Sequence, residues 1–285
     1  MTTYAVAGAT GQLGRLVLGE LLGLVDAANL LAIGRDRSKL ADFASKGVDV
    51  RSADYDQPET LAAALTGVDR LLLISGSALG QRPRQHAAVI EAAKAAGVGY
   101  IAYTSILDAP TTPIRLGGEH RDTEALLAAS GIAHDLLRNG WYNENYFMAL
   151  PMQIEAGVIT GAQGEGRISS AARADLAAGA AHVLVHGKGG DTYDLAGDES
   201  WTMAEFAAEV SRQTGRPLRY EDMGEAEFAA SLIAAGLPEH YAPVFANSAF
   251  STSLGALENN SRTLSKLTGR PTTPIAETIA VMLKG

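Results

Sequence analysis

The chain has 285 residues, of which 47% are hydrophobic and 19% charged, a balance typical of a globular protein rather than a disordered one. A net charge of −9 argues against a broad surface for nucleic acid, and the absence of cysteine excludes disulfides, cysteine-ligated zinc and thiol nucleophiles. Because the N-terminus lacks a basic segment followed by an apolar core, and polar residues interrupt the longest apolar stretch, we expect no signal peptide, no membrane span and a cytoplasmic location.

The first motif is a glycine-rich stretch at residues 4–14, where a short apolar run leads into three glycines spaced three residues apart. Gly8 allows a tight turn after a strand, Gly11 lets the backbone approach a pyrophosphate, and Gly14 lets the next helix pack close to the sheet. That helix has apolar residues at a 3.6-residue period, and its free N–H groups would face a phosphate. The G-x-x-G-x-x-G spacing, between a strand and a helix, favours nucleotide binding over a plain turn.

A second strand is predicted at residues 30–33, and the cofactor preference follows from what comes after it. Sites that prefer NAD carry an acidic residue here to bind the ribose hydroxyls, whereas this chain has Arg35. An arginine fork suits a 2′-phosphate, so the sequence predicts NADP as cofactor, with NADPH preferred over NADH. The alternatives are that Asp36 neutralises the site or that this segment is only a solvated helix start.

Apolar segments with strand or helix periodicity alternate along most of the chain. The remaining strands are predicted at residues 48–51, 69–74, 100–104, 134–138 and 192–195. Helices are predicted from residue 58 and at residues 38–45, 82–96, 117–130, 173–186, 202–215, 225–235 and 274–283. Alternating strands and helices with short connections predict an α/β fold with a Rossmann-type, doubly wound parallel sheet.

The regular alternation lapses after Asn139, which predicts a domain boundary. We assign residues 1–140 to an NADP-binding Rossmann domain, to which later strands from residues 156–196 can return. Residues 141–285 are assigned mostly to a small, mainly helical C-terminal cap on the substrate side.

Cofactor contacts are expected from loops at the carboxyl ends of the strands, where open parallel sheets bind their ligands. Residues 54–56 follow the third strand, where such folds cover the adenine ring, and residues 75–77 follow the fourth, where a nicotinamide ring could lie. The candidate cofactor-binding residues are Gly8, Thr10, Gly11, Gln12, Leu13, Arg35, Asp54, Tyr55, Ser75, Gly76, Tyr103, Thr104, Ser105 and Asn139.

The catalytic pair of ordinary short-chain dehydrogenases is absent, because none of the nine tyrosines has a lysine four residues later. His120 and Glu124 instead lie one turn apart on a predicted helix, so His120 could donate a proton or orient a substrate oxygen. The alternative is a solvent-facing helical histidine. His182 and His186 have a metal-ligand spacing, but their apolar neighbours favour a structural pair and no metal site.

The segment at residues 139–147 is rich in aromatic and amide side chains. These aromatic residues could belong to a core, but next to amides they also suit a planar ligand. We expect substrate contacts from Tyr142, Asn143 and Phe147, and we take Tyr142 together with His120 as the candidate catalytic residues.

Together these motifs resemble the NmrA-like, atypical short-chain dehydrogenases, most closely the bacterial NAD(P)H:quinone oxidoreductases of that group, with the triphenylmethane reductases as near relatives. The resemblance spans nearly the whole chain. The matching stretches are residues 8–14, 54–59, 103–105, 137–142, 173–175, 195–198 and 264–267.

The resemblance implies hydride transfer from NADPH to a quinone or a similar planar acceptor, without flavin or metal. Two alternatives stay open, a reductase of another acceptor such as a triphenylmethane dye and a non-catalytic regulator that senses NADP(H). The expected partner is a small molecule, and both a monomer and a homodimer remain open.

Overall fold

The computed structural model describes residues 1–284 and divides them into two compact units. Unit 1 contains residues 1–109, 118–139 and 173–195, and unit 2 contains residues 110–117, 140–172 and the chain from Ala196 onward. The chain therefore passes from unit 1 to unit 2 at Asn139, where the regular alternation ends, but it also enters unit 2 earlier, at residues 110–117. No sequence signal marked that short excursion.

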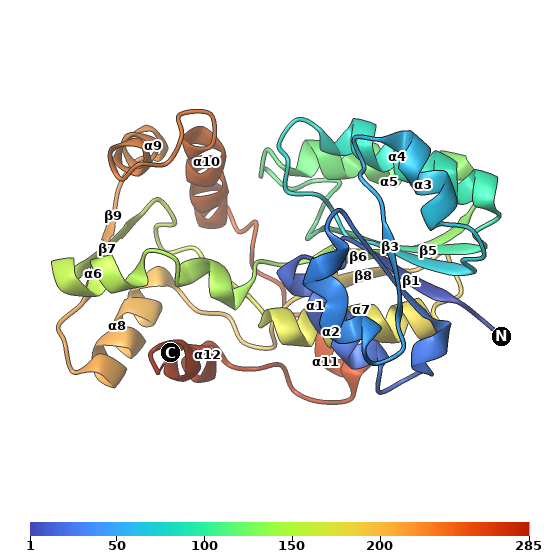
Figure 1. The fold of residues 1–285 in the computed structure, drawn as a ribbon. Helices are drawn as coiled ribbons and strands as arrows, with labels where there is room; N and C mark the ends of the chain where they lie inside the picture. The colour runs from blue at the N-terminus through green and yellow to red at the C-terminus, as the bar shows by residue number, and fades with distance from the viewer. Residues whose placement is uncertain (285) are drawn as a thin grey trace. The chain divides into compact units, whose positions relative to one another are not determined.

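Unit 1 is a parallel sheet of seven strands with helices on both faces, as Figure 1 shows, which confirms the predicted fold class. The strand order is β3-β2-β1-β4-β5-β6-β8. The strands are β1 (Tyr4–Ala7), β2 (Leu30–Gly34), β3 (Asp49–Ser52), β4 (Arg70–Leu73), β5 (Tyr100–Ile106), β6 (Ala133–Asn139) and β8 (Thr192–Leu195). Because the order reverses between β1 and β4, the switch point at which such sheets bind ligands lies at the carboxyl ends of these two strands.

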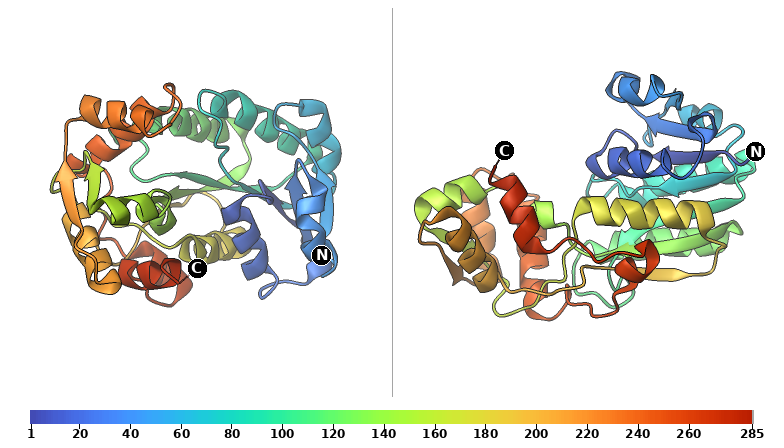
Figure 2. Two further views of the ribbon diagram at one scale, coloured as in Figure 1. Left: turned by 60° about the vertical axis from the view of Figure 1, so that its left-hand side comes forward. Right: turned by 90° about the horizontal axis from the view of Figure 1, so that it is seen from below.

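Two groups of helices cover the two faces of the sheet in unit 1 (Figure 1). One face carries α3 (Pro58–Ala64), α4 (Arg82–Ala96) and α5 (Gly117–Ser130). The other face carries α1 (Gln12–Leu21) and α7 (Arg173–His186), which pack side by side in both views of Figure 2. Short helical turns, η1 (Ala27–Asn29), η2 (Arg37–Leu40) and α2 (Ala41–Ala44), fill the connections. Every residue of β2 and β5 is buried, as expected for strands covered on both faces.

Unit 2 is mainly helical, as predicted, but it also contains a small parallel sheet of β7 (Val158–Gly161) and β9 (Arg219–Asp222). Its helical segments are η3 (Asn143–Tyr146), α6 (Leu150–Ala156), α8 (Met203–Thr214), α9 (Glu225–Ala234), α10 (Ala242–Ser253), α11 (Thr263–Thr268) and α12 (Ile275–Met282). Helix α9 packs against α10, and α12 packs against α8 (Figure 1). The sequence predicted that strands from residues 156–196 can return to the Rossmann domain. Of the two strands in this range, β8 joins the main sheet next to β6, whereas β7 stays in unit 2.

Local signals explain where several of these helices begin and end. Helix α8 begins with a capping box, since Glu205 N–H donates to Thr202 Oγ1 at 3.2 Å and Thr202 N–H donates to Glu205 Oε2 at 2.8 Å. Helix α4 starts with a proline in its first turn and ends at Gly97, whose φ is +77°. Helix α10 also has a proline in its first turn, but no sequence pattern predicted it, because its buried residues are alanines and small polar residues such as Ser248, Ser251 and Thr252 and form no stripe of large apolar side chains. Among residues 1–284, no helix has the length and apolar character needed to span a bilayer.

Candidate functional site

The glycine loop between β1 and α1 has a geometry that only glycine permits. Gly8 has a φ of +83°, and a Cβ at Gly14 would lie 2.4 Å from the carbonyl oxygen of Gly8 and 2.8 Å from Cα of Ala9. Gly11 is the N-cap of α1 and has no side chain with which to bind the first N–H groups of the helix. These N–H groups are therefore free to bind an anion, and the loop fits the pyrophosphate that the sequence predicted.

The residue directly after β2 is the exposed Arg35, which forms no ion pair within residues 1–284, although the Asp56 carboxylate is near enough to interact with its charge. Asp36 is occupied elsewhere, because its carboxylate accepts hydrogen bonds from the N–H of Ser38 at 3.0 Å and from its hydroxyl at 2.6 Å, and these bonds lower the pKa of Asp36. Asp36 therefore caps η2 and does not neutralise Arg35, which stays available for a 2′-phosphate.

The loop after β3 is tied to the start of α4. Both oxygens of the Asp56 carboxylate accept from Gln85 Nε2, each at 3.1 Å, and Asp56 also forms an ion pair with Arg84. These hydrogen bonds, with Arg84 and Arg35 nearby, lower the pKa of Asp56. The Tyr55 ring packs edge-on against His86, 6.4 Å between ring centroids, and its buried hydroxyl has no partner within residues 1–284. Tyr55 thus supports this loop from the core side.

His120 lies on α5 and is buried, with only 5% of its surface exposed, which excludes the alternative of a solvent-facing histidine. Its Nδ1 is 2.8 Å from the hydroxyl of Tyr103, which projects from β5 and is fully buried. Burial, aided by the positive charge of Arg82 and by His86, lowers the pKa of His120 to about 3, and burial also raises the pKa of Tyr103. Both groups are uncharged at neutral pH, so His120 can orient a polar atom but does not carry an imidazolium proton.

Ser105 and Glu124 form a second contact between the same two elements. The Ser105 hydroxyl donates to Glu124 Oε1 at 2.6 Å, and Glu124 forms a two-point ion pair with Arg138 on β6, with N–O distances of 3.1 and 2.8 Å. Two residues along a strand span about 6.6 Å, and four residues along a helix span about 6 Å. The step from Tyr103 to Ser105 on β5 is therefore about as long as the step from His120 to Glu124 on α5, so the two contacts lie one after the other along the same interface. The predicted common face of His120 and Glu124 on α5 is the face that meets β5.

Three predicted cofactor contacts lie near the carboxyl ends of neighbouring strands: Ser75 just after β4, Thr104 two residues before the end of β5, and Asn139 as the last residue of β6. The Ser75 N–H donates to Thr104 Oγ1 at 2.8 Å, which joins the ends of β4 and β5. Asn139 at the end of β6 is 6% exposed, and its side-chain Oδ1 is buried without a hydrogen-bond partner within residues 1–284. An unpartnered buried acceptor costs about 1–3 kcal/mol, so a ligand that donates a hydrogen bond there would be stabilised. This atom fits the carboxamide N–H group of a nicotinamide.

The three predicted substrate contacts all belong to unit 2, where two of them serve its core. Asn143 is fully buried, and its amide donates to Thr278 Oγ1 at 2.9 Å and accepts from Ser170 Oγ at 2.6 Å. Phe147 is 7% exposed and packs against Phe206, with 5.9 Å between ring centroids. Tyr142 is only partly buried. Asn143 and Phe147 therefore have structural contacts, and Tyr142 stays the candidate for the acceptor.

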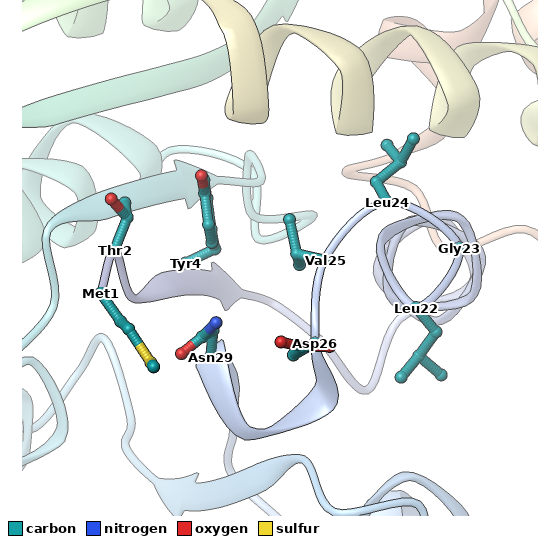
Figure 3. Close-up of a pocket in the computed structure, with 9 residues that line it drawn as sticks. All are labelled: Met1, Thr2, Tyr4, Leu22, Gly23, Leu24, Val25, Asp26 and Asn29. Atoms are coloured by element: carbon teal, nitrogen blue, oxygen red, sulfur yellow. The ribbon is translucent and has the colours of Figure 1, made fainter.

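Two further features of unit 1 lie outside this site. The rings of His182 and His186 are 4.6 Å apart on α7, and residues 1–284 contain no group of three or more potential ligands arranged to hold a metal ion. A shallow hollow of about 520 Å³ is bordered by Met1, Tyr4 and the segment after α1 (Figure 3). It lies at the amino ends of the strands, opposite to the end at which parallel sheets bind nucleotides.

Helix α4 contributes polar residues to this site that were not among the predicted site residues. Arg82, Gln85 and His86 are buried, and they continue the stripe formed by the buried residues Val89 and Ile90. Their spacing of three and four residues was the available signal, because polar side chains on the apolar face of a helix are directed into the protein. Glu119 and Thr123 of α5 complete this group.

The fold, the switch-point glycine loop and the unpaired arginine after β2 together define a nucleotide-binding α/β protein of the Rossmann type. The model of the NAD(P)H-binding family matches residues 8–187. The chain belongs to this family.

Individual members of this family show which proteins the chain resembles in detail. The chain is 50% identical over 277 residues to quinone oxidoreductase 2 of Escherichia coli, covering 97% of both chains, and 30% identical to the NAD(P)H azoreductase of Xenophilus azovorans, covering 95% of both. The crystal structure of the Escherichia coli NADPH-dependent quinone oxidoreductase complexed with NADPH superposes with a TM-score of 0.96 at 48% identity, over 99% of this chain and 100% of that one. The triphenylmethane reductase of Citrobacter sp. superposes with a TM-score of 0.93 at 37% identity, over 99% of this chain and 100% of that one. The resemblance seen in the sequence motifs is confirmed.

Proposed function

We propose that this protein is an NADPH-dependent oxidoreductase that transfers a hydride to a quinone. One observation carries the proposal, namely the 50% identity to a quinone oxidoreductase across 97% of the chain. The site geometry of unit 1 supports it, because a glycine loop, an unpaired arginine and an unpartnered asparagine acceptor lie on the loops that a dinucleotide would cross.

The chain has a residue set for each part of the cofactor. The backbone of residues 8–13 binds the pyrophosphate, Arg35 binds the 2′-phosphate, and Asn139 accepts a hydrogen bond from the carboxamide. When bound, NADPH supplies the hydride. The residues of the chain orient the two reactants, and such orientation contributes up to about 7–11 kcal/mol in well-aligned reactions.

The reaction needs no strong acid from the protein. A quinone that accepts a hydride becomes an aromatic ring with its negative charge on oxygen, and one proton from water completes the hydroquinone. Neither His120 nor Tyr103 supplies an acidic proton at neutral pH. Burial lowers the pKa of His120 to about 3, so the ring has already lost its acidic proton, and burial raises the pKa of Tyr103, so its hydroxyl is a weaker acid than usual. A simple ketone, in contrast, gains no aromatic ring and requires a proton donor at the oxygen during hydride transfer.

The proposal is tested by the oxidation of NADPH with a panel of quinones, triphenylmethane dyes, azo dyes and simple ketones. We expect kcat/KM to be highest for quinones and undetectable for ketones, and to be unaffected by a chelator or by added flavin. A higher kcat/KM with a triphenylmethane dye would favour the second candidate function, which the 37% identity to triphenylmethane reductase supports. Tight NADPH binding without turnover of any acceptor would indicate a sensor instead.

A further inference from the structure

The loop between β4 and α4, residues 74–81, is held by side chains from two helices. The N–H of Gly76 donates to His86 Nε2 at 3.2 Å, and the carbonyl of Gly76 accepts from Arg82 Nε at 2.6 Å. The N–H of Gly80 donates to Glu119 Oε1 at 2.8 Å. Both the N–H and the carbonyl of Gly76, a predicted cofactor-binding residue, are therefore bound by α4.

An ion pair joins the two helices that hold this loop. Arg82 Nη1 lies 3.2 Å from Glu119 Oε2, so Glu119 contacts both the loop and the arginine that binds the loop. Arg82 is only 8% exposed and His86 is fully buried. Buried charged and polar groups are costly unless they are bonded in a defined geometry, so these side chains favour one loop conformation over others.

The hydrogen bonds also determine which nitrogen of His86 carries its proton. Since Gly76 N–H donates to Nε2, the hydrogen must be on Nδ1, which lies 2.9 Å from Thr123 Oγ1. The Thr123 hydroxyl in turn donates to the carbonyl of Glu119 at 3.0 Å. Burial and the charge of Arg82 lower the pKa of His86 to about 4, which keeps the ring in the neutral form that this chain of bonds requires.

The loop lies next to the glycine loop at the switch point of the sheet. Ile74 N–H donates to the carbonyl of Ala7 at 3.3 Å, and a Cβ at Gly8 would lie 3.3 Å from Cβ of Ile74. If a dinucleotide binds with its pyrophosphate at the glycine loop, its nicotinamide ring is expected beside residues 74–81.

From this geometry we propose that Arg82, His86 and Glu119 form a clamp that positions the loop of residues 74–81 against the nicotinamide half of the cofactor. They are positioning residues for hydride transfer, and this inference rests on the proposed function. The pyrophosphate and the 2′-phosphate bind to other elements, at residues 8–13 and at Arg35. Loosening the clamp therefore leaves most of the cofactor affinity intact but misplaces the reacting ring, and a shift of about 1 Å can slow a reaction about a hundredfold.

The test uses the full-length protein with Arg82→Lys, which keeps the charge but cannot reproduce the arginine fork, and His86→Phe, which removes the acceptor of Gly76 N–H. Arg212→Lys is the matched control, because Arg212 forms a two-point ion pair with Glu209 that is exposed on α8. Hydrogen exchange of residues 74–81 should become at least about tenfold faster in the two clamp variants and stay unchanged in the control.

The second readout is the fluorescence of NADPH during titration, which reports the surroundings of the nicotinamide. We expect dissociation constants within about threefold of the unmodified protein but a smaller change in nicotinamide fluorescence in both clamp variants. With a quinone acceptor, kcat should fall at least about tenfold, and the isotope effect with deuterated NADPH should rise because hydride transfer becomes rate-limiting.

Unchanged loop exchange, or faster exchange with unchanged nicotinamide fluorescence, would overturn the clamp. If the unmodified protein reduces no acceptor, the proposed function fails, whereas exchange and fluorescence still decide whether the clamp positions the ring. If turnover is present but kcat stays the same in variants with a loosened loop, the positioning role is wrong and the proposed function stands.

Discussion

The hydroxyl of Tyr103 lies 2.8 Å from Nδ1 of His120, and both side chains are almost completely buried. A histidine that titrates near its usual pKa of about 6.5 would change charge at physiological pH, whereas the pKa of this one is lowered to about 3, chiefly by burial. The pair therefore acts as an uncharged hydrogen-bonding unit in the middle of β5, beside Leu73 at the end of β4, which suits orientation of an acceptor better than acid catalysis.

We expect His120→Asn to lower kcat for quinone by only about tenfold or less, because a solvent proton completes the reaction. The kcat of the unmodified protein should show no step near pH 6.5, since His120 stays neutral through that range. The measurement is kcat from pH 5 to pH 8 in both proteins. A loss of about a thousandfold, close to 4 kcal/mol, would contradict the prediction and indicate that His120 is an obligatory acid.

Cofactor preference should depend on Arg35. A charged hydrogen bond of about 1.5–3 kcal/mol to the 2′-phosphate predicts a dissociation constant for NADPH about ten- to a hundredfold below that for NADH. Arg35→Asp should remove or reverse this preference through repulsion, while Arg216→Asp, an exposed arginine of unit 2, should leave it unchanged. Titration calorimetry with both cofactors measures the ratio, and equal affinities in the unmodified protein would exclude this role for Arg35.

Substitutions of glycines in the first motif should show which glycines are needed for NADPH binding and which for stability. Gly11→Val should abolish NADPH binding with little loss of stability, because a Cβ at Gly11 meets only the Gly8 carbonyl at 3.3 Å. Gly14→Ala should lower the melting temperature as well, since its Cβ would lie 2.4 Å from the same oxygen. Gly19→Ala is the control, because nothing lies within 4 Å of that position in α1, and it should stabilise the protein by about 0.5–1 kcal/mol. Normal NADPH binding by Gly11→Val would show that the loop does not hold the pyrophosphate.

Stability should fall on mild acidification because of His86 and His120. Their folded-state pKa values, about 4 and about 3, lie below the unfolded value near 6.5, so the unfolded chain binds more protons between these limits. The free energy of unfolding therefore decreases as pH falls from about 6.5, with a loss of about 2 kcal/mol for each histidine at pH 5. Urea unfolding at pH 7.5 and pH 5 measures this loss, and His120→Asn should reduce it by about half. A free energy of unfolding that is equal at both pH values would contradict the burial of these rings.

In unit 2, Tyr142 and Asn143 should give opposite results. Tyr142→Ala should raise KM for quinone with little change in NADPH affinity or stability, since Tyr142 is partly exposed. Asn143→Ala should lower stability by about 1–3 kcal/mol, because Thr278 and Ser170 lose their buried partner. Steady-state kinetics and thermal unfolding of both variants distinguish the two roles. Unchanged quinone kinetics in Tyr142→Ala would mean that the acceptor binds elsewhere.

The sequence by itself determined the main sheet and the glycine loop, and it predicts NADP as the cofactor. These features depend on local signals, namely the strand and helix periods, the spacing of Gly8, Gly11 and Gly14, and the arginine directly after β2. The near-complete set of helices in unit 1 follows for the same reason, since Pro58, Pro83 and Gly97 mark helix ends in the chain itself.

Only the tertiary structure decided what the polar side chains bind. Asn143 and Tyr142 are neighbours in the sequence, yet one is fully buried between Ser170 and Thr278 and the other is partly exposed. Gly76 is a predicted cofactor contact, and the structure shows in addition that its peptide groups are bound by Arg82 and His86. Such contacts depend on which distant elements pack together, and a buried polar atom takes whichever partner the packing supplies. Local patterns therefore predict where the site lies, whereas the packing of α4 and α5 on the sheet determines which residues can act in it.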